Sequence, residues 1–195
     1  YRIAQISDLH NAQFGEENSQ LLELLESTDP DCIDLTGDLA DSRRTDVEVA
    51  VSFGERAVKI APVYYVNGNH ESRIEEYEDL KAGLEKAGVT VLENQVVPLE
   101  RSDQQIYLTG VNDPSFQTDF LFDEPEQVLR WELDQVTPEK DEYWILLSHR
   151  PEYFDLYREY RVDLVFTGHA HGGQFRLPFV GGCLLYTSPS PRDRG

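Results

Sequence analysis

The chain contains no methionine and only two cysteines, Cys32 and Cys183, among its 195 residues. Two cysteines are too few for the disulfide framework that stabilises many small secreted proteins. Cys32 lies in an apolar stretch, so we expect it to be a small buried residue. No apolar run approaches the roughly 18 residues that a membrane-spanning helix needs. The length of 195 residues and the hydrophobic content of 39% predict one globular domain with an ordinary hydrophobic core.

Basic residues are scarce, with 17 Lys and Arg against 37 Asp and Glu, so the net charge is −20. A protein that binds the phosphate backbone of a nucleic acid needs clustered Lys and Arg, and we therefore expect no nucleic acid partner. Any anionic substrate would need bound cations to reverse the local field. Acidic runs such as residues 75–79 are expected to lie on a solvated surface.

Short apolar runs alternate with segments of helical periodicity along the chain. Strands are predicted near 3–7, 32–36, 62–66, 89–93, 96–99, 105–111, 143–148 and 162–167. Helices are predicted near 19–27, 46–60, 75–87, 124–135 and 152–159. The spacing of the first three strands suits strand, crossover helix and next strand. This order predicts an α/β sandwich or a doubly wound layer arrangement.

The pattern changes near the C-terminus. Residues 1–182 carry the alternating pattern, whereas residues 183–195 are rich in Ser, Pro and Arg without periodicity. We predict that residues 183–195 are a disordered or foreign tail to a truncated domain. The chain also opens at Tyr1 rather than at a methionine, so we interpret it as a fragment or processed product, in which a missing targeting signal carries no information.

All five histidines lie in short motifs that also carry Asp, Asn, Glu or Gly. These motifs are Asp8-Leu9-His10, Gly37-Asp38-Leu39-Ala40-Asp41, Gly68-Asn69-His70-Glu71, Ser148-His149-Arg150 and Gly168-His169-Ala170-His171. Each follows a predicted strand by one to three residues, and the carboxyl ends of strands are where open α/β sheets collect their sites. Nitrogen and oxygen ligands in this number suit a pair of catalytic divalent metals better than a structural metal site.

The residue types suggest how the ligands would be divided between two metals. Asp8 and His10 are two positions apart at a strand end, so both side chains can turn into one cleft. Asp38 is the natural bridging ligand, because a carboxylate has two oxygens and the preceding Gly37 lets the backbone approach closely. Asn69 offers a neutral carbonyl oxygen. The two histidines that flank Ala170 can each reach a different metal.

Together, the five motifs in this order resemble the calcineurin-like metallophosphoesterase family, from Ile3 to about Gly182. The resemblance is greatest to bacterial envelope-associated metallophosphoesterases, which makes a cell-envelope location an expectation. It implies a four-layer α/β/β/α sandwich, from which the family's last strands would be missing here. It also implies a phosphomonoester or phosphodiester substrate, with manganese, iron or zinc as the two divalent cations.

The resemblance further implies a role for each residue. The first metal would be held by Asp8, His10, Asp38 and His171, and the second by Asp38, Asn69, His149 and His169. A hydroxide that bridges the metals would attack phosphorus. His70 would act as general acid toward the leaving group, and Asp41 would orient His70.

Several residues have alternative roles. Asp8 and Asp38 can be helix N-caps. Arg43, Arg44 and Arg150 can either bind substrate phosphate or pair with surface acids. Trp131 and Trp144 lie in apolar-periodic segments and are expected in the core rather than at a substrate platform.

Three other functions stay open at this point. A non-catalytic scaffold of the same fold would be expected to lose ligands, whereas every expected ligand is present. A zinc amidohydrolase or peptidase gives no role to Gly68-Asn69-His70-Glu71 as a unit. An inert truncated product is supported only by the unusual tail. The sequence leaves the substrate, the metal identity and the oligomeric state open.

Overall fold

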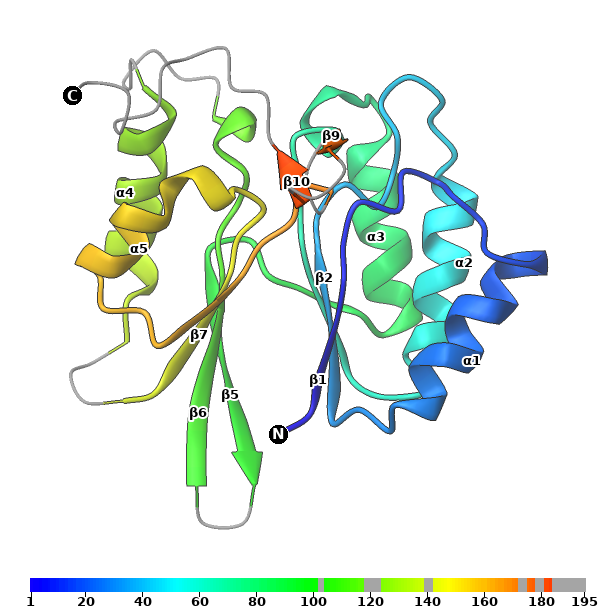
Figure 1. Ribbon diagram of the computed structural model, residues 1–195, viewed down its shortest axis with the longest axis horizontal. Helices are drawn as coiled ribbons and strands as arrows, with labels where there is room; N and C mark the ends of the chain where they lie inside the picture. The colour runs from blue at the N-terminus through cyan, green and yellow to red at the C-terminus, as the bar shows by residue number, and fades with distance from the viewer. Residues whose placement is uncertain (102–103, 118–123, 139–141, 172–174, 178–180, 184–195) are drawn as a thin grey trace.

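The computed structural model describes residues 1–101, 104–117, 124–138, 142–171, 175–177 and 181–183 (Figure 1). Its first half is a parallel sheet whose strands lie in chain order: β1 (Ile3–Ile6), β2 (Cys32–Thr36), β3 (Val63–Val66) and β4 (Thr90–Val91). The connecting helices cover the outer face of this sheet: α1 (Ser19–Ser27), α2 (Val47–Ala57) and α3 (Tyr77–Ala87).

The second half forms another four-stranded sheet: β5 (Gln95–Arg101), β6 (Gln104–Gly110), β7 (Trp144–Leu147) and β8 (Leu164–Phe166). Strand β5 pairs antiparallel with β6, while β6, β7 and β8 are parallel. Helices α4 (Pro125–Val136) and α5 (Phe154–Glu159) cover its outer face (Figure 1). The short 3₁₀ turns are η1 (Glu16–Asn18), η2 (Glu71–Arg73), η3 (Pro114–Phe116) and η4 (Pro151–Tyr153).

Three apolar clusters separate the layers. One packs the first sheet against α1–α3, one lies between the two sheets, and one packs the second sheet against α4 and α5. Strand β7 contributes to two of them, because successive side chains of a strand point to opposite faces. Ile145 and Leu147 enter the cluster between the sheets, while Trp144 and Leu146 pack against the helices. The predicted four-layer α/β/β/α sandwich is confirmed.

The predicted elements agree with the structure to within a few residues at each end. The main exception is the strand near 89–93, which is reduced to Thr90–Val91. The antiparallel pair β9 (Phe175–Leu177) and β10 (Gly181–Cys183) was not predicted. Of the predicted tail, only Cys183 is described, at the end of β10. The tail and the missing family strands therefore stay predictions that concern chain outside the described residues.

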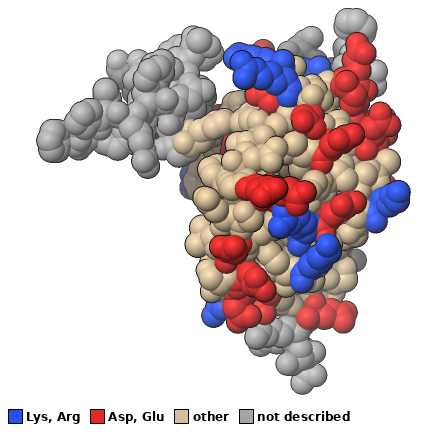
Figure 2. All heavy atoms as spheres, turned by 90° about the vertical axis from the view of Figure 1, so that its right-hand side faces the viewer, with Lys and Arg blue, Asp and Glu red and all other residues tan. Residues whose placement is uncertain are grey.

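Two further expectations concern burial and surface. Cys32 is buried as expected, and Trp144 is in the core, but Trp131 is 45% exposed, so its predicted core position was wrong. Figure 2 shows acidic side chains spread over the face that α1–α3 form, in agreement with a solvated acidic surface. Among the described residues, no helix combines the length and apolar character that crossing a membrane requires.

Asp34 is a buried carboxyl group in the middle of β2. Its side chain is fully buried, and neither of its oxygens has a hydrogen-bond partner within the described part of the chain. Burial raises the pKa of Asp34 to about 7, with only the neighbouring Cys32 thiol acting in the opposite direction. A buried carboxyl without a donor favours its neutral form.

We predict that Asp34 makes the fold less stable as pH rises. Its pKa is higher in the folded than in the unfolded chain, so the folded chain holds an extra proton between about pH 4 and the folded pKa of about 7. In that window the free energy of unfolding should fall by up to ~1.4 kcal/mol per pH unit. Urea unfolding of Asp34→Asn should lack this part of the slope. The exposed Asp79→Asn should keep it, and an unchanged slope in Asp34→Asn would contradict the prediction.

Candidate metal centre

Five loops that carry the sequence motifs converge at one end of the sandwich. Three follow β1, β2 and β3 of the first sheet, and two follow β7 and β8 of the second. Backbone hydrogen bonds continue the pairing beyond the strands, since the Asp8 N–H donates to Gly37 O and the Gly168 N–H donates to His149 O. The carboxyl ends of parallel strands therefore bring together side chains as distant in the sequence as Asp8 and His171.

The backbone at this site adopts strained conformations. Five predicted ligands have positive φ: Asp8 (56°), His10 (47°), Asp38 (51°), His169 (64°) and His171 (48°). Non-glycine residues rarely adopt this region, and such strain clusters at functional sites. Neither Asp8 nor Asp38 is the N-cap of a helix, because the first two helices are preceded by Asn18 and Asp46. The alternative role of both residues is thereby excluded.

Glycines allow the loops to approach each other closely. A Cβ on Gly37 would lie 2.6 Å from His149 Nδ1, and its φ of +87° also disfavours any side chain. A Cβ on Gly68 would lie 2.3 Å from Asp38 Oδ1. The expected close approach at Gly37 is confirmed, and Gly68 serves the same purpose from β3.

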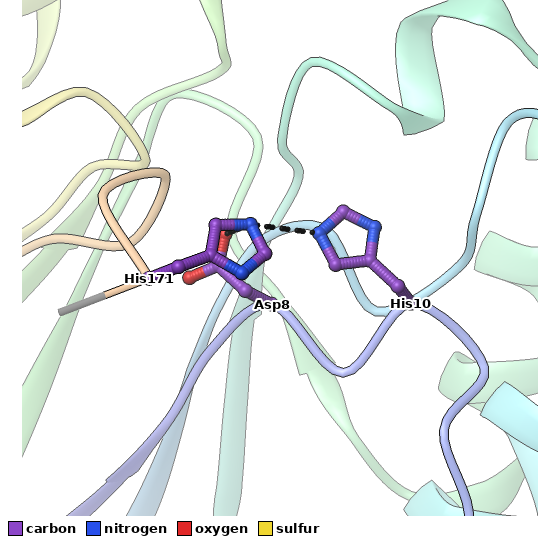
Figure 3. A group of neighbouring side chains, drawn as sticks. All are labelled: Asp8, His10 and His171. Carbon is purple, nitrogen blue, oxygen red and sulfur yellow. Dashed lines mark hydrogen bonds and ion pairs between the residues drawn. The ribbon is translucent and has the colours of Figure 1, made fainter. Parts of the chain in front are cut away.

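The first ligand group consists of Asp8, His10 and His171. One ligand atom from each lies within 4.8 Å of the others. The Nε2 atoms of His10 and His171 are 3.1 Å apart, and His171 Nε2 is 3.5 Å from Asp8 Oδ1. Figure 3 shows the two imidazoles facing each other, with the Asp8 carboxylate beside His171. Loops from both sheets therefore share this group.

The second ligand group consists of Asp38, His149 and His169, which satisfy the same 4.8 Å limit. Asn69 adjoins it, with Oδ1 3.2 Å from His149 Nε2. Asp38 lies between the groups, because its Oδ2 is 3.2 Å from His149 Nε2 and 3.7 Å from His10 Nε2. The seven predicted ligands are therefore brought together in one place. Asp38 belongs to the second group and also forms, with His10 and His70, a third group within the same 4.8 Å limit that links it to the first.

Hydrogen bonding around His149 indicates that the second group suits a cation. The His149 Nδ1–H donates to Thr36 O at 2.8 Å, which directs Nε2 toward the oxygens of Asp38 and Asn69. Three lone pairs that converge in a buried place repel one another unless a proton or a metal ion lies between them. A carbonyl behind a ligating imidazole is also the usual support of a metal-bound histidine.

The pKa values follow from the same contacts. Burial opposes ionisation of Asp38, yet the hydrogen bond and charge of His149 lower the pKa of Asp38 to about 2. Burial likewise disfavours protonated His149, but Asp38 outweighs it and raises the pKa of His149 to about 9. Burial is the main cause of the lowered pKa values of His10 and His169. Neutral imidazoles are the form that binds metals.

His70 lies beside the first group, with its ring centroid 4.4 Å from that of His10. Its Nδ1 accepts a hydrogen bond from the Ser42 N–H at 3.1 Å, with Ser42 Oγ at the same distance. Asp41 interacts through its charge with both His70 and His10, and its Oδ2 is 3.7 Å from His10 Nδ1, so the expected role of Asp41 in orienting His70 stays a prediction. Asp41 Oδ1 also accepts the N–H groups of residues 43 and 44, and this turn presents the Ser42 N–H to His70.

Glu71 is a buried acid at the site that was not predicted from the sequence to have a role of its own. It is fully buried and accepts three backbone N–H bonds, from Asp38 at 2.9 Å, Ala40 at 2.9 Å and Gly68 at 2.8 Å. Burial and the Asp38 charge raise the pKa of Glu71 to about 7, against the N–H groups of Ala40 and Gly68. The available signal was an acid directly after Gly-Asn-His. Glu71 joins the loops that carry Asp38 and Asn69.

Comparison with known proteins agrees with this geometry. The profile of the family described as calcineurin-like phosphoesterase matches residues 1–173. This chain belongs to the calcineurin-like phosphoesterase family. Relatives include the uncharacterized metallophosphoesterase YkoQ of Bacillus subtilis, 26% identical over 181 residues, covering 90% of this chain and 63% of the relative. The phosphodiesterase YaeI of Escherichia coli is 28% identical over 195 residues, covering 93% and 64%.

Solved structures support the fold of this calcineurin-like phosphoesterase. The protein TT1561 of Thermus thermophilus superposes with a TM-score of 0.65 at 19% identity, covering 85% of this chain and 80% of that one. At this identity the likeness concerns the fold alone. The chain spans a little under two thirds of the length of YkoQ and YaeI.

We predict that Glu71→Gln destabilises the protein by on the order of 2–3 kcal/mol, because an amide offers one acceptor oxygen and turns a donor toward backbone N–H groups. The affinity for divalent metal should also fall, by about 10- to 100-fold. Urea unfolding and metal titration measure the two effects. The exposed Glu75→Gln is the matched control. Equal stability of the two variants would contradict the role of Glu71.

Proposed function

We propose that this chain is a metal-dependent phosphoester hydrolase with a dinuclear centre. Asp8, His10, Asp38 and His171 would hold one divalent cation, and Asp38, Asn69, His149 and His169 the other. Family membership alone does not establish this activity for the chain, because the curated relatives are longer than the part that the chain matches. Manganese, iron or zinc suits such a mixed nitrogen and oxygen ligand set.

The observation that carries the proposal is the position of the Asp38 carboxylate. Its Oδ2 lies within 3.7 Å of an imidazole nitrogen from each ligand group. Its Oδ1 accepts the His70 N–H at 2.9 Å, which fixes the direction of the carboxylate. A carboxylate held in this way between two ligand groups is suited to bridge two cations.

When bound, the two cations would supply a bridging hydroxide nucleophile and Lewis-acid stabilisation of charge on the phosphoryl oxygens. The chain itself would supply the proton. Because His70 Nδ1 accepts from the Ser42 N–H, the neutral ring carries its proton on Nε2. We propose that His70 takes up a second proton from solvent and donates the Nε2 proton to the leaving-group oxygen, which returns the ring to its neutral form. We also propose that Asp41, whose charge acts on both His70 and His10, helps to orient His70.

The substrate would be a phosphodiester or a phosphomonoester. The relative YaeI is named a phosphodiesterase, which makes a diester the first substrate to test. The net charge of −20 supports a requirement for bound metal before an anionic substrate can approach.

The main test combines metal content with hydrolysis of bis-p-nitrophenyl phosphate. We expect about two metals per chain and turnover with added manganese, and loss of both after chelation. Asp38→Asn should lose bound metal, because it removes one anionic oxygen from both groups. The exposed Asp79→Asn should keep both metal and activity. A folded wild-type chain with neither metal nor turnover would leave the non-catalytic scaffold as the function.

A second prediction concerns proton donation. His70→Ala should keep its metal but lose about 10²- to 10⁴-fold in kcat on an alkyl phosphodiester, whose leaving group needs a proton. The loss should be much smaller with p-nitrophenolate, a good leaving group. Ser42→Ala retains the backbone N–H that orients His70 and should keep most activity. Equal losses of His70→Ala on both substrates would remove His70 as the proton donor.

A further inference from the structure

Arg150 directly follows His149, and its guanidinium is held by Asp113. Nε donates to Asp113 Oδ2 at 2.5 Å, and Nη2 donates to Asp113 Oδ1 at 3.0 Å. Nη2 also donates to Ser115 Oγ at 2.9 Å. The side chain of Arg150 is 17% exposed, and that of Asp113 is fully buried. This bidentate contact with Asp113 fixes both the position and the plane of the guanidinium.

Asp113 is in turn fixed by the loop that carries Asn69. Its N–H donates to Asn67 Oδ1 at 2.8 Å, and its Oδ1 accepts the Ser115 N–H at 2.9 Å. Asn67 follows β3 directly and also donates to Tyr77 Oη at 2.9 Å. The loops after β3, β6 and β7 therefore determine together where the Arg150 guanidinium lies, so little side-chain freedom remains for binding to remove.

One guanidinium nitrogen is engaged much less than the others. Nη1 has two long contacts, both at 3.4 Å, to Glu152 Oε1 and to His169 Nε2. A hydrogen bond of this length is weak. His169 belongs to the second ligand group, so Nη1 lies at the edge of that group. A purely structural arginine would need only the contacts of Nε and Nη2 with Asp113 and Ser115.

We propose that Arg150 is a phosphoryl-binding residue, whose Nη1–H donates to a non-bridging oxygen of a phosphoryl group bound beside His149 and His169. Asp113 positions it for this contact. The inference rests on the proposed function and adds to it the binding of the phosphoryl group by this chain's own donor. Arginine suits this role because it stays protonated and can bind a carboxylate and a phosphoryl oxygen at the same time.

The test measures binding of inorganic phosphate to the metal-loaded protein by calorimetry, with metal content determined on the same samples. In Arg150→Ala the Kd for phosphate should rise about 10- to 100-fold while two metals stay bound. KM for bis-p-nitrophenyl phosphate should rise with it, and added guanidinium ion should restore part of the loss. Arg158→Ala, which removes an exposed arginine of α5 that is paired with Asp155, should change neither.

An unchanged Kd for phosphate in folded, metal-loaded Arg150→Ala would overturn the proposal and leave Arg150 as a structural link. If that variant does not fold, Arg150→Lys decides instead. Its ammonium group can pair with Asp113 but cannot form the bidentate contact of a guanidinium. The Kd of this variant for phosphate should therefore rise as well, and an unchanged value overturns the proposal. A wild-type chain without metal or turnover contradicts the proposed function, whereas active wild type with unaffected Arg150 variants contradicts this inference alone.

Discussion

The arrangement of the whole site depends on how the Asp38 loop is held. Glu71 accepts the N–H groups of Asp38, Ala40 and Gly68, and Asp38 accepts the N–H of His70. These bonds join the loops after β2 and β3 into one unit on the first sheet. The second sheet meets this unit through His149, whose ring contacts both Thr36 and Asp38. Because Asp38 contacts groups from both sheets, it fixes the positions of the two ligand groups relative to each other.

The strained backbone of the ligand loops is consistent with a site whose loops hold one another in place. A non-glycine residue at positive φ costs of order 1–3 kcal/mol, and such conformations persist only where surrounding bonds determine them. The His169 N–H donates to Asp8 Oδ1 at 2.9 Å, and the His10 N–H donates to Asp38 O at 3.0 Å. Backbone donors of strained residues are thus bound by the neighbouring loops. The two sheets together, rather than either one alone, stabilise the ligand conformations.

The sequence predicted most strands and the convergence of the motifs, because apolar alternation and the position of each motif after a strand are local signals. It could not predict contacts that depend on the phase of a helix or the path of a turn. On α4 the buried stripe includes Val128 and Leu133 together with Glu132, a buried acid that accepts from Asn94. This phase leaves Trp131 on the exposed side, against its hydrophobic character. The Ser42 contact with His70 likewise depends on a turn that composition does not reveal.

The charges around the site impose an order on binding. Asp8, Asp38 and Asp41 line the ligand groups, while burial lowers the pKa values of His10 and His169 and so favours their neutral forms. The chain as a whole carries −20. Such a cluster attracts divalent cations and repels a phosphoester as long as its carboxylates are uncompensated. If cations and a phosphoester bind here as proposed, metal should bind before substrate, and Arg150 could direct a phosphoryl group only after the cations have reversed the local field.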